Sequence, residues 1–185
     1  ESHWITFSQR ATYPLWLNNH TLIFVAHHNN IANFYKVNVT TKQITPVTEF
    51  DTNTQLLTPS MSAAKDTLFF AMSPPSGIID LYQLKLSSFT LTQLTDTPEA
   101  ELYPLEIPTG QLVYTSHKDT SANLVKLQLD SAKTTPLTDL DSMIQPIQWS
   151  ATDQQIMALG FDDRLSKNTG RVLVGVDPAR TPSTN

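Results

Sequence analysis

Short apolar runs recur along the chain at a nearly constant interval. Four of them cover residues 21–26, 67–72, 111–115 and 155–159. Each run is almost unbroken, which is typical of a strand that other elements cover on both faces. A proline precedes every run, and these prolines lie 45, 45 and 42 residues apart: Pro14, Pro59, Pro104 and Pro146. A period of this length with several strands per unit predicts a β-propeller.

The same order of strands is predicted in every unit. The first unit has strands at 15–17, 21–26, 34–39 and 43–48, and the second has them at 60–62, 68–72, 81–86 and 91–95. The third unit repeats these strands at 105–107, 112–115, 124–129 and 135–138. In the fourth unit only three strands are predicted, at 147–150, 156–159 and 172–176. The chain is therefore predicted to be all-β, a propeller of four-stranded antiparallel blades at about 13–49, 58–96, 103–139 and 145–177. Together they form a single propeller domain, or a propeller segment, over residues 1–185.

Two details favour this order over a β-sandwich of many short strands. The second strands are apolar throughout, as inner strands between neighbouring blades should be, and the third strands alternate. Pro46 and Pro136 both fall in a predicted fourth strand, and proline belongs on an edge strand because it donates no hydrogen bond. A sandwich leaves the recurrence of the same four-strand order unexplained.

Residues 4–8 are predicted to form a strand that stands before the first unit. They occupy the place that a fourth strand occupies before the next proline, so they are predicted to be the outermost strand of another blade. Two interpretations stay open. In a complete chain the strand closes the fourth blade, and in part of a larger propeller it completes a blade that lies upstream.

Composition excludes several classes of protein. Apolar residues make up 39% of the chain and charged residues 16%, which is neither a disordered nor a membrane composition, and no apolar run is long enough to insert into a membrane. The net charge is −5 and no run of basic residues exists, so neither nucleic acid nor an anionic membrane is an expected partner. The absence of cysteine removes disulfides, thiolate chemistry and cysteine metal sites.

Several short matches recur in register: Pro14-Leu15-Trp16, Leu81-Tyr82, Leu94-Thr95-Asp96, Leu137-Thr138-Asp139, and Pro146 followed by Trp149-Ser150 and Asp153. With them the units resemble the propeller repeat of TolB-like proteins, although four repeats are present where the TolB propeller has six. The resemblance implies a non-catalytic, periplasmic or otherwise extracytoplasmic domain whose surface docks another protein. A similar repeat forms the gating propeller of prolyl-oligopeptidase-like peptidases and the outer sensor portion of membrane-anchored winged-helix regulators.

Residues that could carry chemistry are few. The five glycines form neither a Gly-x-Ser-x-Gly elbow nor a phosphate-binding loop. His27 and His28 are neighbours whose side chains should point to opposite faces, so a solvated pair is favoured over a metal site shared with His117. Asp162-Asp163 resembles a cation-binding pair, but the nearby Arg164 and Lys167 favour a salt-bridged loop. No catalytic residue, cofactor or metal is predicted.

Charge is sorted between the two ends of the predicted blades. The links from fourth to next first strand share one end with the links from second to third strand, and together they hold ten acidic residues against four basic ones. The rest of the chain holds seven acidic and eight basic residues. On one interpretation, this excess of acidic residues serves solubility alone. On the other, this acidic face binds a partner, through Glu49, Asp51, Asp96, Glu99, Glu101, Asp139, Asp141, Asp162 and Asp163.

The leading functional prediction is a binding module that docks a protein or peptide, basic in charge, through this face. The alternatives are the substrate-gating propeller of a prolyl-oligopeptidase-like peptidase, with catalysis elsewhere, and an extracytoplasmic sensor domain. An enzyme that acts with these residues alone ranks last, because no nucleophile–base pair or ligand cluster stands out.

Overall fold

Antiparallel sheets follow one another in the order of the chain. The computed structural model describes residues 10–75, 77–161 and 171–182. The first sheet, blade 1, has the order β1-β2-β3-β4, with β1 at Thr12–Asn18, β2 at Thr21–His28, β3 at Ile31–Asn38 and β4 at Ile44–Pro46. Blade 2 has the order β5-β6-β7-β8, with β5 at Gln55–Met61, β6 at Thr67–Ser73, β7 at Asp80–Lys85 and β8 at Thr90–Gln93.

The remaining strands form two further blades that share one sheet. Blade 3 contains β9 (Ala100–Ile107), β10 (Gln111–Lys118), β11 (Ser121–Gln128) and β12 (Thr134–Pro136). Blade 4 contains β13 (Met143–Ser150), β14 (Gln155–Phe161) and β15 (Arg171–Val176). A single parallel bridge between Ala122 and Met143 joins the two. Within the described residues, blade 4 has three strands, as the sequence predicts.

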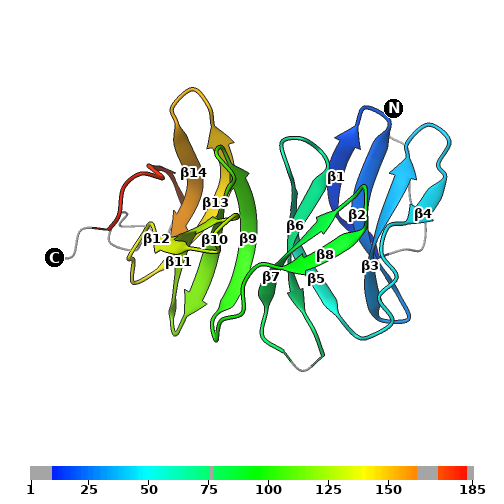
Figure 1. Ribbon diagram of the computed structural model, residues 1–185, viewed down its shortest axis with the longest axis horizontal. Coiled ribbons are helices and arrows are strands. Elements are labelled where there is room, and N and C mark those ends of the chain that lie inside the picture. The colour runs from blue at the N-terminus through cyan, green and yellow to red at the C-terminus, as the bar shows by residue number, and fades with distance from the viewer. Residues whose placement is uncertain (1–9, 76, 162–170, 183–185) are drawn as a thin grey trace.

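The blades lie side by side along the molecule. Blade 1 is at one end, blade 2 follows it, and the strands of blades 3 and 4 lie at the other end (Figure 1). The described residues form strands and connecting turns with no helix, so the prediction of an all-β propeller with four-stranded antiparallel blades is confirmed. Residues 4–8, predicted to donate a strand, lie outside the described residues, and their placement in another blade stays a prediction.

Apolar side chains on both faces of each sheet hold neighbouring blades together. Alternate residues of a strand point to opposite faces, so Ile23 and Val25 of β2 face blade 2 while Phe24 faces away from it. Phe34 of blade 1 meets Phe70 of blade 2 edge to face, with ring centroids 4.9 Å apart. Separate clusters of the same kind join blade 2 to blade 3 and blade 3 to blade 4.

The first strand of each blade begins earlier than the sequence predicts. The predicted starts at Leu15, Ser60, Leu105 and Ile147 become Thr12, Gln55, Ala100 and Met143. The repeated prolines therefore lie inside these strands, and a register shift follows at each one. The prediction failed because proline interrupts a ladder in general, but the innermost strand has a free edge where its missing N–H costs nothing.

A repeated side-chain clamp fastens the outer strand of the first three blades. In blade 1, the Thr48 hydroxyl donates to Asn33 Oδ1 at 2.8 Å and accepts the N–H of Phe34 at 2.9 Å. Asn33 also accepts the N–H of Phe50 and donates to its carbonyl oxygen. Blade 3 repeats every one of these bonds, with Asn123 and Thr138 in these roles. In blade 2, Asp80 and Thr95 hold the equivalent places.

Replacing Asn33 with alanine is expected to lower the free energy of unfolding by about 2–4 kcal/mol, because the hydrogen-bonding groups of Phe50 and Thr48 lose their partner in a buried place. Urea denaturation of both proteins measures the difference. The control is Asn19→Ala at an exposed turn, which should change stability by less than about 0.5 kcal/mol. Equal effects of the two variants would contradict the clamp.

Candidate functional site

The linkers between blades carry acidic side chains, and all of them lie at the same end of the blades. They follow the outer strands and cover residues 47–54, 94–99 and 137–142, and they contain neither Lys nor Arg. Six of the predicted binding residues lie in them: Glu49, Asp51, Asp96, Asp139 and Asp141, all exposed, and Glu99, which is half-buried. We call these six residues the acidic surface. Asp162 and Asp163 lie outside the described residues.

Each clamp places one of these acids. The residue that follows the clamp threonine is acidic in all three blades: Glu49 after Thr48, Asp96 after Thr95 and Asp139 after Thr138. Because the clamp fixes the threonine to the neighbouring strand, it fixes the backbone from which the acid projects. The turns at the opposite end of the blades carry both signs of charge instead, with Lys42, Lys65 and Lys133 beside Asp66, Asp130 and Asp153.

Glu101 is not on this surface, although the sequence predicted it there. Its side chain is only 1% exposed, because β9 begins at Ala100 and carries Glu101 into the contact between blades 2 and 3. Oε1 accepts the Thr97 hydroxyl at 2.9 Å, whereas Oε2 has no hydrogen-bond partner in the described structure. Leu56, which stands 45 residues earlier, fills the corresponding place between blades 1 and 2. A carboxyl group has thus replaced an apolar side chain.

Burial shifts the titration of this group and of its neighbours. Loss of solvation raises the pKa of Glu101, the hydroxyls of Thr95 and Thr97 partly oppose the shift, and the charge of Asp80 adds to it. Loss of solvation also raises the pKa of Asp80. Tyr114 is buried against the same group, and its pKa is raised by burial and by the charges of Glu101 and Glu99. The contact between blades 2 and 3 therefore favours protonated acids.

The inner strands of all four blades line a groove of about 270 Å³. Tyr13, Thr58 and Tyr103 each precede a repeated proline here, and each has a positive φ, of 53°, 44° and 57°. Such backbone is uncommon for residues with a side chain, and it costs of order 1 kcal/mol or more each time. Ser60 Oγ lies on the same lining, is buried and has no hydrogen-bond partner within the described residues. Sequence analysis missed this groove, and the period of the prolines was the only pattern that pointed to it.

The histidines differ in how far they are exposed to solvent. His27 and His28 are exposed at the end of β2. His117 is half-buried beside Tyr103 and Phe161, burial lowers its pKa, and its Nε2 has no partner in the described structure. Among the residues that the structure describes, no three His, Asp or Glu side chains are grouped closely enough to hold a metal ion.

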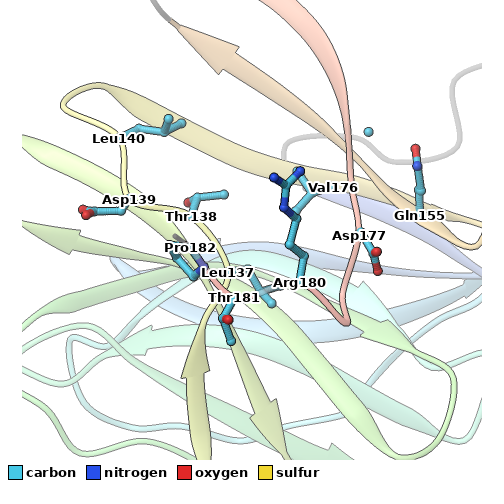
Figure 2. A pocket seen from close by; sticks show the side chains of 11 residues that line it. Leu137, Thr138, Asp139, Leu140, Gln155, Val176, Asp177, Arg180, Thr181 and Pro182 are labelled. Carbon is cyan, nitrogen blue, oxygen red and sulfur yellow. The ribbon is translucent and has the colours of Figure 1, made fainter. Parts of the chain in front are cut away.

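A cavity of about 770 Å³ separates the last strand from the linker of blade 3. The linker residues Leu137 and Leu140 border it on one side, and Val176 and Asp177 border it on the other (Figure 2). The Arg180 side chain extends between these walls (Figure 2).

Comparison with solved structures identifies the arrangement of these blades, although no family model matches the chain and no curated protein sequence matches it. TolB from Acinetobacter baumannii is similar with a TM-score of 0.67 and 18% identity, over 84% of this chain and 39% of that one. The fold is that of a TolB-like β-propeller. Oligogalacturonate lyase in complex with manganese (TM-score 0.60, 14% identity) matches 87% of this chain and 48% of its own. Puromycin hydrolase (TM-score 0.62, 13% identity) matches 84% and 26%.

The chain therefore spans less than half the length of each of these three proteins. At these identities the likeness shows the fold alone, and the three proteins with this arrangement of blades are a TolB, a lyase and a hydrolase. In the part of the chain that the structure describes, no helix is long and apolar enough to cross a membrane.

Replacing Glu101 with glutamine is expected to raise the free energy of unfolding by about 1–2 kcal/mol at neutral pH, because a neutral amide costs less to bury than a carboxylate. Since the pKa of Glu101 is raised, the folded chain holds its proton more tightly than the unfolded chain. The wild-type protein should therefore be most stable below the ordinary pKa of glutamate and lose stability as pH rises through that value toward the folded-state pKa.

Urea denaturation between acidic and neutral pH measures this loss of stability. The glutamine variant should reduce the loss but not abolish it, because the pKa of Asp80 is raised as well. The matched control is the exposed Glu49→Gln, which removes the same unit of charge and therefore measures the effect of net charge alone. An identical profile in wild type and Glu101→Gln would show that the side chain is solvated.

Proposed function

We propose that this chain is a non-catalytic binding module that docks a basic protein or peptide on the acidic surface. The observation that carries the proposal is the clamp followed by an acid in three successive blades. Nothing in the clamp requires an acidic residue at the next position, because Glu49, Asp96 and Asp139 are exposed and the threonine makes the contacts. A fixed row of like charges supports binding more than a solubility role, which needs no fixed positions.

The electrostatics of the linkers support a cationic partner. Exposed like charges within about 8–10 Å of one another reinforce the potential that a ligand meets at physiological salt. The absence of Lys and Arg from the three linkers leaves no cation of their own to cancel it. Charge of this kind speeds encounter and selects partners by sign, and added salt weakens it.

The cellular location of this chain, and the kind of longer protein to which it belongs, are part of the same proposal. The TolB likeness supports an extracytoplasmic domain that meets another protein. The likeness to puromycin hydrolase supports the second candidate, a propeller that controls access to a peptidase site outside these residues. An α/β-hydrolase region in the same reading frame would favour the peptidase, and an upstream winged helix with an apolar span would favour a sensor.

Neutralising the acidic surface with Glu49→Gln, Asp96→Asn and Asp139→Asn together is expected to weaken binding of a lysine-rich dodecapeptide about tenfold at low salt. The salt dependence of the remaining binding should also flatten, since fewer charges are left to screen. Fluorescence anisotropy of the labelled peptide over a series of salt concentrations measures both effects.

The matched control removes three acids from the other end of the blades, with Asp130, Asp153 and Asp177 changed to asparagine. This variant has the same net charge as the first and should bind the peptide nearly as well as wild type. Equal losses in the two variants would mean that only the total charge matters, which would refute a docking surface made by the linkers.

A further inference from the structure

The clamp of blade 2 differs from the clamps of blades 1 and 3 in one chemical group. Asp80, which is 7% exposed, stands where those blades have the amides of Asn33 and Asn123. An amide accepts hydrogen bonds through its oxygen and donates through its nitrogen, whereas an ionised carboxylate only accepts. Asn33 and Asn123 each use both atoms to hold the linker that follows. Ionised Asp80 can therefore make only one of these two kinds of bond.

The bond that Asp80 does make to the linker is long. Its Oδ1 accepts the N–H of Thr97 at 3.3 Å. The corresponding N–H groups of Phe50 and Leu140 lie 2.7 and 2.8 Å from the amide oxygens of their clamps. The second oxygen of Asp80, Oδ2, accepts the side-chain amide of the exposed Gln93. An ionised Asp80 has no donor for the carbonyl of Thr97, which is the group that the amides bond in the other two clamps.

A second carboxyl group holds the same linker residue. Oε1 of Glu101 accepts the hydroxyl of Thr97 at 2.9 Å, and its Oε2 is buried without a hydrogen-bond partner in the described structure. The N–H of Glu101 donates at 2.8 Å to the carbonyl of Ile79, the residue before Asp80, so the two acids stand on adjoining backbone. Thr97 is therefore held by two buried carboxyl groups, one from β7 and one from β9.

The surroundings of the two carboxyl groups disfavour their ionised forms. Loss of solvation raises the pKa of both Asp80 and Glu101, and neighbouring negative charges add to the shift. The other titratable groups that interact with this pair come from the linker, β7 and β10, and none is basic: Asp96, Glu99, Tyr82 and Tyr114. Lys118 lies farther along the same face of β10, is exposed, and is among the causes of neither shift. His117 points to the other face of blade 3.

We propose that Asp80 and Glu101 form a proton-controlled clamp, which holds the linker of residues 94–99 when the two groups are protonated and releases it when both are ionised. A protonated carboxyl group has an O–H donor, which is what the amides supply in the other clamps. Two ionised carboxylates repel each other beside the residue that both must hold. Blades 2 and 3 each have a described neighbour on their other side, so the burial of this pair does not depend on either end of the sequence.

The direction of the pH dependence follows from burial. Because the pKa of each acid is raised in the folded chain, the closed clamp holds its protons more tightly than an open one. The clamp is therefore fully effective below the ordinary pKa of a carboxyl group and weakens as pH rises through the folded-state pKa. Asp96 and Glu99 lie on this linker, so a partner on the acidic surface meets them fixed at acidic pH and mobile at neutral pH. Only this last consequence rests on the proposed function.

Hydrogen exchange of single backbone amides in the full chain, followed by NMR, tests the release without any partner. Protection of the Thr97 amide, relative to exchange in an unfolded peptide at the same pH, should fall at least about tenfold between acidic and neutral pH. The amides of Phe50 and Leu140 are internal controls, because they bond uncharged asparagine side chains at the same position of the clamp. Constant protection of Thr97, or an equal fall at all three amides, would overturn the proposal.

Two variants exchange the chemistry of the clamps. Asp80→Asn gives blade 2 the amide of the other blades and should raise the protection of Thr97 at neutral pH at least about tenfold. The reciprocal variant Asn33→Asp, at a position that is also 7% exposed, should make the protection of Phe50 fall as pH rises. Urea denaturation confirms that each variant is folded. Unchanged protection of Thr97 in folded Asp80→Asn would overturn the proposal, and this result is separate from that of the peptide-binding test because no peptide is present.

Discussion

Every sheet of this protein has apolar side chains on both faces, and each face needs a cover. Burying one large apolar side chain contributes about 1.5–3 kcal/mol, and each contact between blades buries several, among them Phe34, Leu68 and Phe70 between blades 1 and 2. A sheet of this kind is stable only beside another, so the blades stack in chain order. The same requirement makes an uncovered face informative, and Leu173 is the large apolar residue most exposed, together with Phe89.

The clamp adds hydrogen bonds to the outer strands, which are short. The strands β4 and β12 have three residues each, so the ladder alone offers few hydrogen bonds to hold them. The polar side chains of Asn33 and Asn123 supply three further bonds each and also bind the backbone of the linker that follows. The linkers of blades 1 and 3 are therefore held to their sheets by the same hydrogen bonds. Acidic residues placed next to the clamp inherit this regular spacing, which links the stability of the blade to the geometry of the candidate surface.

The sequence was sufficient to predict the number of blades, the order of strands and the positions of Pro46 and Pro136, because these depend on apolar periodicity and on local backbone chemistry. It was insufficient for the starts of the inner strands. Proline is tolerated within these strands because one edge of the innermost strand is unpaired, and that depends on the tertiary arrangement. That error also put Glu101 in a loop, although the strand buries it. The partners of Thr48 and Thr138 were missed as well. The Leu-Thr ends were visible in the sequence, but the asparagines lie 15 residues earlier, and their bonds depend on the register of β3 and β11.

Departures from the repeat are more informative than its matches, because packing alone explains the matches. Glu101 stands where blade 2 has the apolar Leu56, and its pKa is raised by burial with no basic residue among the causes of the shift. The fourth blade departs at one place in three ways: Val172 replaces the clamp residue, Leu173 is exposed, and cavities follow the strand. The exposure of Leu173 and the cavities arise together, because among the described residues no outer strand pairs with β15 and no blade covers it, whereas Val172 is a separate change in sequence.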